Sequence, residues 1–378
     1  MLDYATLRLL WWAVLGVLLI GVAVMDGLDY GAAILLPLVG KTEIERRIVI
    51  NAVGPVWEGN QVWLILGGGA AFAAWPPLYA VAFSGFYFAM LLLLASLILR
   101  PVGFTFRGKI DNPHWRAAWD GALFAGGFVP ALVFGVAFGN VLQGAPFTFD
   151  DAMRLTYRGD LWGLFNPFAL LAGLVSVAMI VMHGAAWLAC KTVGAVQARA
   201  RRAGALAALA LILLFAAAGL AARQTNFYAL GAGVDHAGAS NPLAKSVTQG
   251  VGLLWRNYAL YPWMILAPAL GFSGAAIAGA LAWRAAAPKL ALLASGLAIA
   301  GVIATAGVSM FPFLLPSSID PRSSLTVWDA SSSQMTLMIM AVATAIFLPL
   351  VLIYTAWVYS VLRGPVTAER IARVGHSY

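Results

Sequence analysis

The sequence predicts an all-α integral membrane protein with about nine transmembrane helices, arranged as two four-helix bundles and one peripheral helix. Of its 378 residues, 62% are hydrophobic and only 10% are charged, whereas soluble domains carry roughly 25% charged residues. The apolar residues fall in runs of about 20 or more, the length that an α-helix needs to cross a bilayer. The single cysteine, Cys190, excludes an internal disulfide and any cluster held by several cysteines.

The first four helices form the first predicted bundle, at about residues 7–141. Pro37 lies near the inner end of the first helix and predicts a bend or break there. The second helix stops at Pro76-Pro77, because paired prolines cannot continue a helix. The third ends at Arg100, and the fourth carries Pro130 at mid-depth. The expected bounds of these four helices are 7–40, 51–75, 78–99 and 117–141.

A long loop at 142–160 separates the first bundle from the second, which we expect at about 161–315. The seventh helix is interrupted by Pro262 and Pro268. A polar loop then leads to the peripheral ninth helix. All nine helices belong to one polytopic domain, 1–378. The expected bounds of the last five helices are 161–190, 204–222, 253–283, 290–315 and 335–362.

The distribution of Lys and Arg predicts the orientation in the membrane. Basic residues are concentrated in the loops after the first, third, fifth and seventh helices and in the C-terminal tail. The positive-inside rule assigns that side to the cytoplasm. The N-terminus is then periplasmic and the C-terminus cytoplasmic, as an odd number of spans requires. This distribution also accounts for the net charge of +8, so no nucleic-acid partner is predicted.

Several polar side chains lie inside predicted spans, where a charged group costs at least ~2.5–3.5 kcal/mol at the helix centre. Asp26 and Asp29 are three residues apart and share a helix face, as do Glu58 and Gln61. Counted from the loops, the charged members converge on the cytoplasmic half of the first bundle. The set comprises Asp26, Asp29, Glu58, Asn60, Gln61, Arg100 and Asp120.

Two interpretations of this set stay open. In the structural one, Arg100 pairs with Asp29 or Asp120 to hold helices in register, and the other polar groups form hydrogen bonds between helices. In the functional one, the buried carboxyl groups take up and release protons, as in proton relays. Glu58 favours the functional interpretation, because its own turn offers it no cation.

The remaining candidates are aromatic or imidazole side chains. Trp57 and Trp63 flank Glu58 and are candidates for contact with a cofactor ring. His183 is the one histidine within a predicted span, and a lone membrane histidine is more often a hydrogen-bonded packing residue than a ligand. No grouping of His, Cys, Asp and Glu has the spacing of a metal site. We therefore expect no metal site in this chain.

The chain resembles subunit II of the cytochrome bd family of quinol oxidases from one end to the other. The most specific motifs are GNQVW at 59–63, FPFLLPSS at 311–318 and WDASSSQ at 328–334, in this order. Further matching segments are MDGLDYG at 25–31, the run at 83–107, FVPALVFGVAFGNVLQG at 128–144, NPFALLAG at 166–173 and SNPLAK at 240–245.

The resemblance implies a subunit of a terminal oxidase in the bacterial inner membrane that oxidises a membrane quinol and reduces O2 to water with cytoplasmic protons. Haem b and haem d, or a b-type substitute, would be ligated by subunit I. Subunit II would be the partner of that haem-bearing chain and line a proton pathway through Glu58, Asp26, Asp29 and Asp120. A structural quinone or lipid and small single-helix accessory subunits are compatible with this assembly.

One departure from the family pattern concerns the proposed acid itself. The resemblance places Asp preceded by His where this chain has Glu58 preceded by Trp57. Glu keeps the proton-carrying group and reaches one methylene further, whereas Trp removes a titratable neighbour. Two other functions stay open from the residues alone: a secondary transporter, which also has broken helices and buried acids, and a purely structural scaffold of the oxidase.

Overall fold

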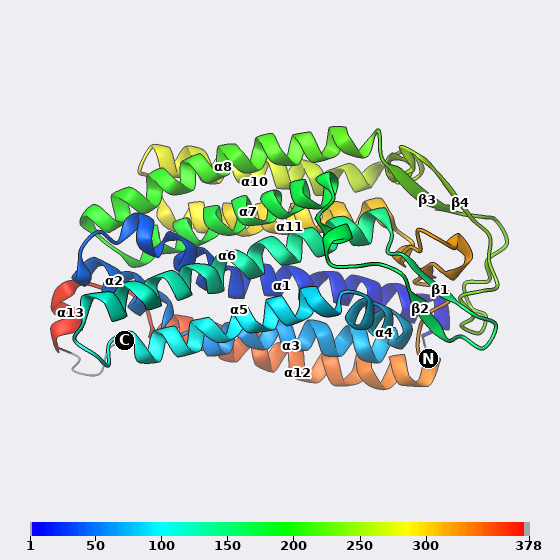
Figure 1. The fold of residues 1–378 in the computed structure, drawn as a ribbon, viewed down its shortest axis with the longest axis horizontal. Helices are drawn as coiled ribbons and strands as arrows, with labels where there is room; N and C mark the ends of the chain where they lie inside the picture. The colour runs from blue at the N-terminus through cyan, green and yellow to red at the C-terminus, as the bar shows by residue number, and fades with distance from the viewer. Residues whose placement is uncertain (1, 374–378) are drawn as a thin grey trace.

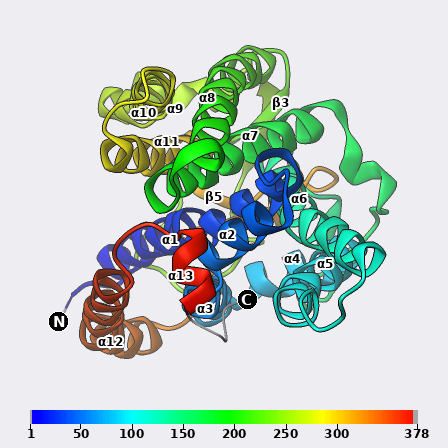
Figure 2. The ribbon, with the colours of Figure 1, turned by 90° about the vertical axis from the view of Figure 1, so that its left-hand side faces the viewer.

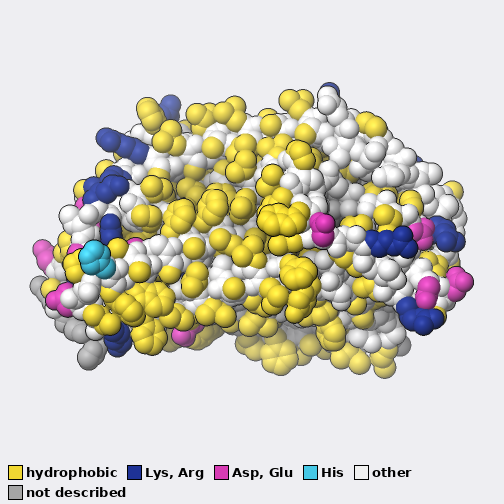
Figure 3. Space-filling view, viewed as in Figure 1, with side chains coloured by type: hydrophobic (Ala, Val, Ile, Leu, Met, Phe, Trp, Pro, Cys, Tyr) yellow, Lys and Arg dark blue, Asp and Glu magenta, His cyan; other side chains and the backbone are white. Residues whose placement is uncertain are grey.

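The computed structural model describes residues 2–373 and is mostly helical, which confirms the predicted fold class. The long helices run side by side, and α1 begins at the end of the molecule where α12 also begins (Figure 1). Apolar side chains cover the middle of the surface, and Lys and Arg gather towards its two ends (Figure 3). This distribution fits a chain whose middle lies in lipid and whose ends meet water.

Eight helices of the described chain are long and apolar enough to cross a membrane, which confirms eight of the predicted spans in outline. The ninth predicted span contains α3 (Trp57–Ala74). This helix has a lower mean hydropathy than the other eight, because Glu58, Asn60 and Gln61 lie at its start. The eight spans are α1 (Tyr4–Val39), α5 (Tyr87–Phe106), α6 (Pro113–Gln143), α7 (Pro167–Lys191), α8 (Gly194–Ala222), Pro262–Trp283, α11 (Pro288–Met310) and α12 (Gln334–Val361).

The prediction of one continuous helix over 51–75 was wrong, because the chain turns at residues 54–56. The helix before the turn is α2 (Glu43–Val53), and α3 begins after it. Pro55 within the turn has no N–H to donate, so the series of helical backbone hydrogen bonds cannot continue through it. α2 starts with a capping box in which Thr42 and Glu45 bond each other's backbone N–H groups. It is an amphipathic helix beside the inner end of α1.

Two further predicted helices are also interrupted. The span at 78–99 divides at Phe86 into α4 (Pro76–Gly85) and α5, and the ring of Tyr157 packs beside this point, 2.4 Å from where a Cβ on Gly85 would lie. The span at 253–283 divides at Pro262 into short turns and the main helix. Its parts are η2 (Leu253–Trp255), α9 (Arg256–Leu260), η3 (Pro262–Ile265) and α10 (Leu266–Trp283). In contrast, α1 continues through Pro37 to Val39, so no break occurs there.

Short antiparallel hairpins occupy the loops at the end of the molecule where α1 begins (Figure 1). Sequence reasoning missed all of them, because strands of two to five residues carry almost no periodic signal. The pairs are β1 (Phe147–Phe149) with β2 (Leu155–Tyr157), β3 (Asn226–Leu230) with β4 (Val247–Val251), and β5 (Phe313–Leu315) with β6 (Leu325–Thr326). The remaining short helices are η1 (Trp162–Phe165), η4 (Pro321–Ser323) and α13 (Ala368–Arg373).

α1 lies in the middle of the helices and packs against α3, α6, α7 and α11. Seen along the helices, α7, α8, α10 and α11 lie together on one side of α1, and α3, α4 and α5 lie on the other (Figure 2). α12 lies at the edge, where it contacts α1 and α3. Asn60 of α3 therefore meets Asp29 of α1 near the centre of the molecule.

Candidate functional site: a buried acid and arginine cluster

The centre of the candidate site is an ion pair between α1 and α5. Arg100 donates to both carboxylate oxygens of Asp26, at 2.7 and 3.3 Å, and both side chains are almost completely inaccessible. The guanidinium also lies 4.1 Å from the ring centroid of Tyr30. α6 leaves room for this side chain at Gly126, where a Cβ would be 3.0 Å from Arg100 Cγ. The prediction that Arg100 pairs with Asp29 or Asp120 was wrong, because α1 turns Asp26 towards α5.

Asp29 lies beside this pair and faces α3 instead. Asn60 Nδ2 donates to Asp29 Oδ2 at 2.9 Å, and the Tyr359 hydroxyl of α12 donates to Asn60 Oδ1 at 2.8 Å. The other oxygen, Asp29 Oδ1, has no hydrogen-bond partner within the described chain, and neither do Tyr30 Oη and Arg100 Nε. Buried polar atoms are rarely left unpaired. Three such atoms in neighbouring side chains leave Asp29, Tyr30 and Arg100 with unused capacity to bond an ordered water molecule or to exchange a proton.

Asp120 belongs to a separate cluster nearer the inner end. Its carboxylate accepts from Arg107 Nε at 2.6 Å and from Arg46 Nη1 at 2.7 Å. Arg107 also donates to Glu43 of α2, at 2.8 Å. Asp120 thus lies at the inner end of the first bundle, as predicted, but it is paired with two arginines of its own and does not contact Asp26 or Asp29. This cluster ties α2 to α5 and α6, at the inner mouth of the bundle.

The ion pair between Glu43 of α2 and Arg107 predicts that the stability of the protein depends on pH. Burial raises the pKa of Glu43, but the hydrogen bond and charge of Arg107, with Arg116 and Arg46, outweigh burial and lower it below the usual 4.5. Because the folded-state pKa is lowered, the link stabilises the protein above about pH 4.5 and is lost as the pH falls further. Glu43→Gln should thus lower the stability at pH 7 by at most about 1 kcal/mol, since Glu43 is partly exposed.

The measurement is the thermal unfolding of the purified protein at pH 7 and at pH 4. The difference between the wild type and Glu43→Gln should shrink at pH 4. Glu369→Gln is the control, because it removes the same charge from an exposed position on α13. A Glu43→Gln effect that persists unchanged at pH 4, or an equal effect in the control, would contradict the ionic link.

Glu58 does not join either cluster. It lies in the first turn of α3 on the exposed face, with Val62 and Ile65, whereas Asn60 on the same turn points inward to Asp29. Gln61 is half-buried between these two directions. Glu58, which the sequence analysis counts among the buried carboxyl groups, is therefore exposed on the surface of this chain. A carboxylate at this level of a membrane protein needs a polar neighbour, and this chain does not supply one to Glu58 among the described side-chain hydrogen bonds and ion pairs.

The two tryptophans beside Glu58 take different directions. Trp63 is buried and packs on α1, where a Cβ on Gly21 would lie 2.3 Å from its ring, so its ring does not reach the surface. Its expected place at a cofactor interface is therefore incorrect. Trp57 is half-buried, with its ring centroid 6.1 Å from that of Phe104. Trp57 therefore remains as the aromatic side chain beside Glu58 that reaches the surface.

The comparisons with known proteins agree with this architecture. Residues 7–362 match the family described as cytochrome bd terminal oxidase subunit II. The chain belongs to this family. Cytochrome bd-I ubiquinol oxidase subunit 2 of Escherichia coli is 48% identical over 378 residues, 100% of both chains. Cytochrome bd ubiquinol oxidase subunit 2 of Bacillus subtilis is 30% identical and covers 96% of this chain and 98% of its own.

Two other relatives support the same assignment. A probable cytochrome oxidase subunit 2 of Haemophilus influenzae is 48% identical over 377 residues, again 100% of both chains. The solved bd oxidase of Geobacillus thermodenitrificans contains a chain with a TM-score of 0.69, at 19% identity, covering 94% of this chain and 98% of that one, which shows the fold. As a cytochrome bd subunit II, the chain is part of a multi-pass quinol:oxygen oxidoreductase complex of the bacterial inner membrane. This membership decides against the secondary transporter.

Membership of the cytochrome bd family implies haem in the complex and a partner subunit I. The described residues of this chain do not fit haem ligation. His183, the buried histidine of α7, donates from Nε2 to the carbonyl of Val24 at 2.9 Å, and its Nδ1 lies 2.7 Å from Ser295 Oγ. Both ring nitrogens are thus occupied, which agrees with a packing role. Within residues 2–373, no group of three or more His, Cys, Asp or Glu side chains could hold a metal.

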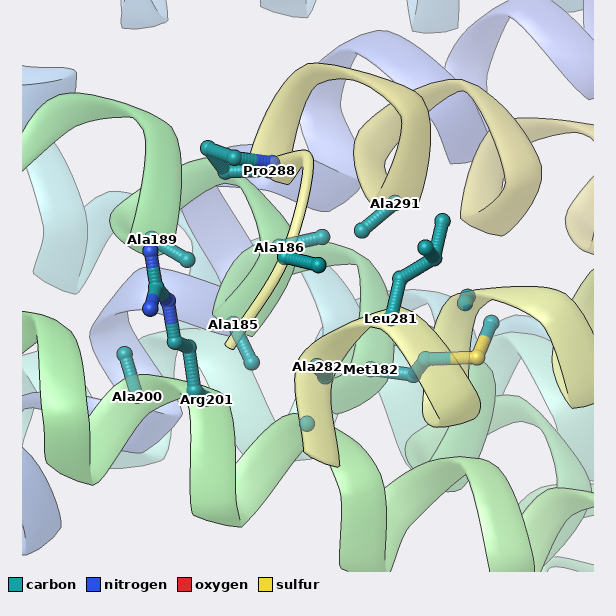
Figure 4. A pocket seen from close by; sticks show the side chains of 13 residues that line it. Met182, Ala185, Ala186, Ala189, Ala200, Arg201, Leu281, Ala282, Pro288 and Ala291 are labelled. Carbon is teal, nitrogen blue, oxygen red and sulfur yellow. The ribbon is translucent and has the colours of Figure 1, made fainter. Parts of the chain in front are cut away.

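A small cavity among the helices of this subunit II is too small for a cofactor. It lies between α7, α8, α10 and α11 and is lined mainly by alanine methyl groups, with Arg201 at one edge (Figure 4). Its volume of about 10 Å³ is enough for roughly one water molecule. A haem or a quinone ring cannot enter it without moving the helices.

Sequence reasoning missed several residues of the site. Tyr359 reaches Asn60 from a helix about 300 positions away, and no local pattern connects the two. The charged residues of the inner loops were expected only to set the orientation in the membrane. They include Arg46, Arg107 and Glu43, and the number of charged residues close to Asp120 was a usable signal. An acid at the inner end of a span, with basic loops on both sides, is a candidate for such pairing.

Proposed function

We propose that this chain partners the haem-bearing subunit I of a cytochrome bd quinol oxidase and lines the route by which cytoplasmic protons reach that subunit. The N-terminus would be periplasmic and the C-terminus cytoplasmic, with helices 1–4 and 5–8 as two bundles. Haem b and haem d, or a b-type substitute, would be held by subunit I and supply the redox chemistry. Its electron donor would be a membrane quinol, as the names of the relatives suggest. Small single-helix subunits and a structural quinone or lipid would complete the assembly.

One observation carries the proton route: a fully buried carboxylate, Asp29, keeps one oxygen free of hydrogen bonds in the inner half of α1. A carboxylate with a free oxygen can accept a proton without breaking a bond. Asp26 cannot do so as easily, since Arg100 occupies both of its oxygens. Arg100 therefore compensates one of the two neighbouring acids and leaves the other for proton transfer.

The route continues through α3, which separates this cluster from the exposed face. Asn60 bonds Asp29 on one side, and Glu58 lies two residues earlier on the other side. Both lie in the first turn after the break at residues 54–56, where the helix ladder is interrupted. Protons would enter beside Asp120 at the inner mouth, bind near Asp26 and Asp29, and leave at Glu58 towards subunit I. Trp57 would line the same face against the haem-bearing chain.

Glu58→Gln in the assembled complex tests the proposal. Gln has nearly the same shape but cannot carry a proton, so quinol oxidase turnover should fall at least about tenfold with the haem spectrum unchanged, about 1.4 kcal/mol in activation free energy. Glu58→Asp is the matched control, because it keeps the carboxyl group and should retain most of the turnover.

The scaffold function makes the opposite prediction. If Glu58→Gln keeps normal turnover, subunit II does not deliver protons through Glu58 and acts as a structural partner. If both substitutions lose haem together with activity, Glu58 stabilises the interface instead. Either result would overturn the proposed route and leave the family membership intact.

A further inference from the structure

Four cations gather at the inner end of the molecule on the side formed by α8, α10 and α11. We call this set the inner basic corner: Arg201 and Arg202 of α8, Arg284 directly after α10, and Lys289 in the first turn of α11. Arg201 Nη1 donates to the carbonyl of Ala285 at 3.0 Å, which joins α8 to the loop between α10 and α11. Arg201 and Pro288, the residue before Lys289, also line the same small cavity. Arg202 follows Arg201 in the chain, and Arg284 directly precedes Ala285. The four cations therefore belong to one corner of the structure.

Within residues 2–373, no carboxylate forms an ion pair with any member of the inner basic corner. The acids at this end pair with other cations: Glu43 and Asp120 with Arg107, and Glu45 with Arg199. Asp111 is bound by Arg116. The corner thus carries four positive charges that its own chain does not balance, and like charges held close together repel one another. An anionic ligand would relieve this repulsion.

Each of the three helices places its cation at the inner end of an exposed apolar stripe. On α8, Arg202 lies one turn before Leu206, and the stripe continues at helical spacing. Arg284 follows the exposed face of α10, and Lys289 begins that of α11. Trp283, 76% exposed, marks the level of the membrane interface. The exposed apolar residues of the stripes are Leu206, Leu209 and Leu213 on α8, Ile277 on α10, and Leu293 and Leu297 on α11.

The inner basic corner lies away from the face of α3 that carries Glu58. Seen along the helices, α8, α10 and α11 are on the opposite side of α1 from α3, which carries Glu58 (Figure 2). Dark blue side chains lie at the end of the molecule where α8 begins, and apolar side chains cover the middle of the molecule (Figure 3). A cationic end followed by an apolar stripe matches the shape of a phospholipid, whose phosphate lies at the interface and whose chains lie along the helices.

We propose that the inner basic corner binds an anionic phospholipid of the inner leaflet. Its phosphate group contacts Arg202, Arg284 and Lys289, and its acyl chains lie on the stripes of α8, α10 and α11. Arg201 holds the loop between α10 and α11 in place for this contact. The ligand is a lipid rather than free phosphate, because the cations are continuous with apolar surface.

The test uses the intact two-subunit complex, purified in mild detergent, delipidated, and titrated with cardiolipin, phosphatidylglycerol or phosphatidylethanolamine. Native mass spectrometry counts the bound lipids. The site variant is Arg202→Gln/Arg284→Gln/Lys289→Gln. The control variant, Lys41→Gln/Lys109→Gln/Arg363→Gln, removes the same charge from three exposed cations elsewhere on the inner surface. The site variant should bind the anionic lipids about 100-fold more weakly than the wild type.

The control variant should bind like the wild type, and zwitterionic phosphatidylethanolamine should bind weakly to all three proteins. Equal lipid binding by the site and control variants would overturn the proposal, and so would displacement of the lipid by millimolar inorganic phosphate, which would indicate a phosphate site. A wild-type complex that binds no anionic lipid would overturn the proposal as well. Turnover measured in parallel keeps this result separate from the Glu58 test.

Discussion

Replacing Arg100 with methionine is expected to destabilise the protein by about 3–5 kcal/mol, the range found when one partner of a buried ion pair is removed. Asp26 is completely inaccessible, and Arg100 occupies both of its oxygens. Methionine fills much of the same volume, so the loss comes from charge rather than from a cavity. The variant also loses the contact of the guanidinium with the Tyr30 ring.

The double variant Asp26→Asn/Arg100→Met separates charge compensation from packing. It removes both charges, so it should be more stable than Arg100→Met alone, although it makes more substitutions. The measurement is the unfolding midpoint of the assembled complex, followed by its haem absorbance. If the double variant is as unstable as the single one, Arg100 stabilises the fold through packing against Gly126 and Tyr30, and not through Asp26.

The spans of this chain were predictable because their signal is local. Runs of apolar residues long enough for a bilayer are visible in the sequence, and eight of them became membrane-length helices. The interruptions were harder to predict, since they depend on tertiary neighbours. Pro37 lies in a continuous helix, whereas Phe86 ends one helix and begins the next without any proline, beside the ring of Tyr157. A proline is therefore neither sufficient nor necessary for an interruption, and the packing of neighbouring side chains has to be known as well.

The site was predictable as a list of residues but not as a geometry. The i, i+3 spacing placed Asp26 and Asp29 on one side of α1, yet a small rotation of the helix decides which of them meets Arg100. Similarly, Asn60 and Glu58 lie in one turn of α3, and only the packing of α3 on α1 sends the amide inward and the carboxyl outward. Contacts across hundreds of residues, such as Tyr359 to Asn60, leave no local trace.

Gly31→Val is the second substitution with a large expected effect, because α1 and α7 touch through their backbones. A Cβ on Gly31 would lie 2.4 Å from the carbonyl oxygen of Ile180 and 2.7 Å from Gly184 Cα. Backbone atoms cannot move aside as a flexible side chain can, so the two helices would have to separate. We expect a loss of about 3 kcal/mol in stability, at the upper end of the usual range for overpacking.

Gly16→Val on the same helix is the matched control. A Cβ there meets nothing within 4 Å, and the change in helix propensity is the same at both positions. Separation of α1 from α7 would also shift Asp26 and Asp29, which lie within two turns of Gly31, relative to α3 and α5. Gly31→Val should therefore lower both the unfolding midpoint and the quinol oxidase turnover, whereas Gly16→Val should change neither by much. Equal effects of the two substitutions would show that helix propensity, and not the close approach of α1 and α7, governs the response.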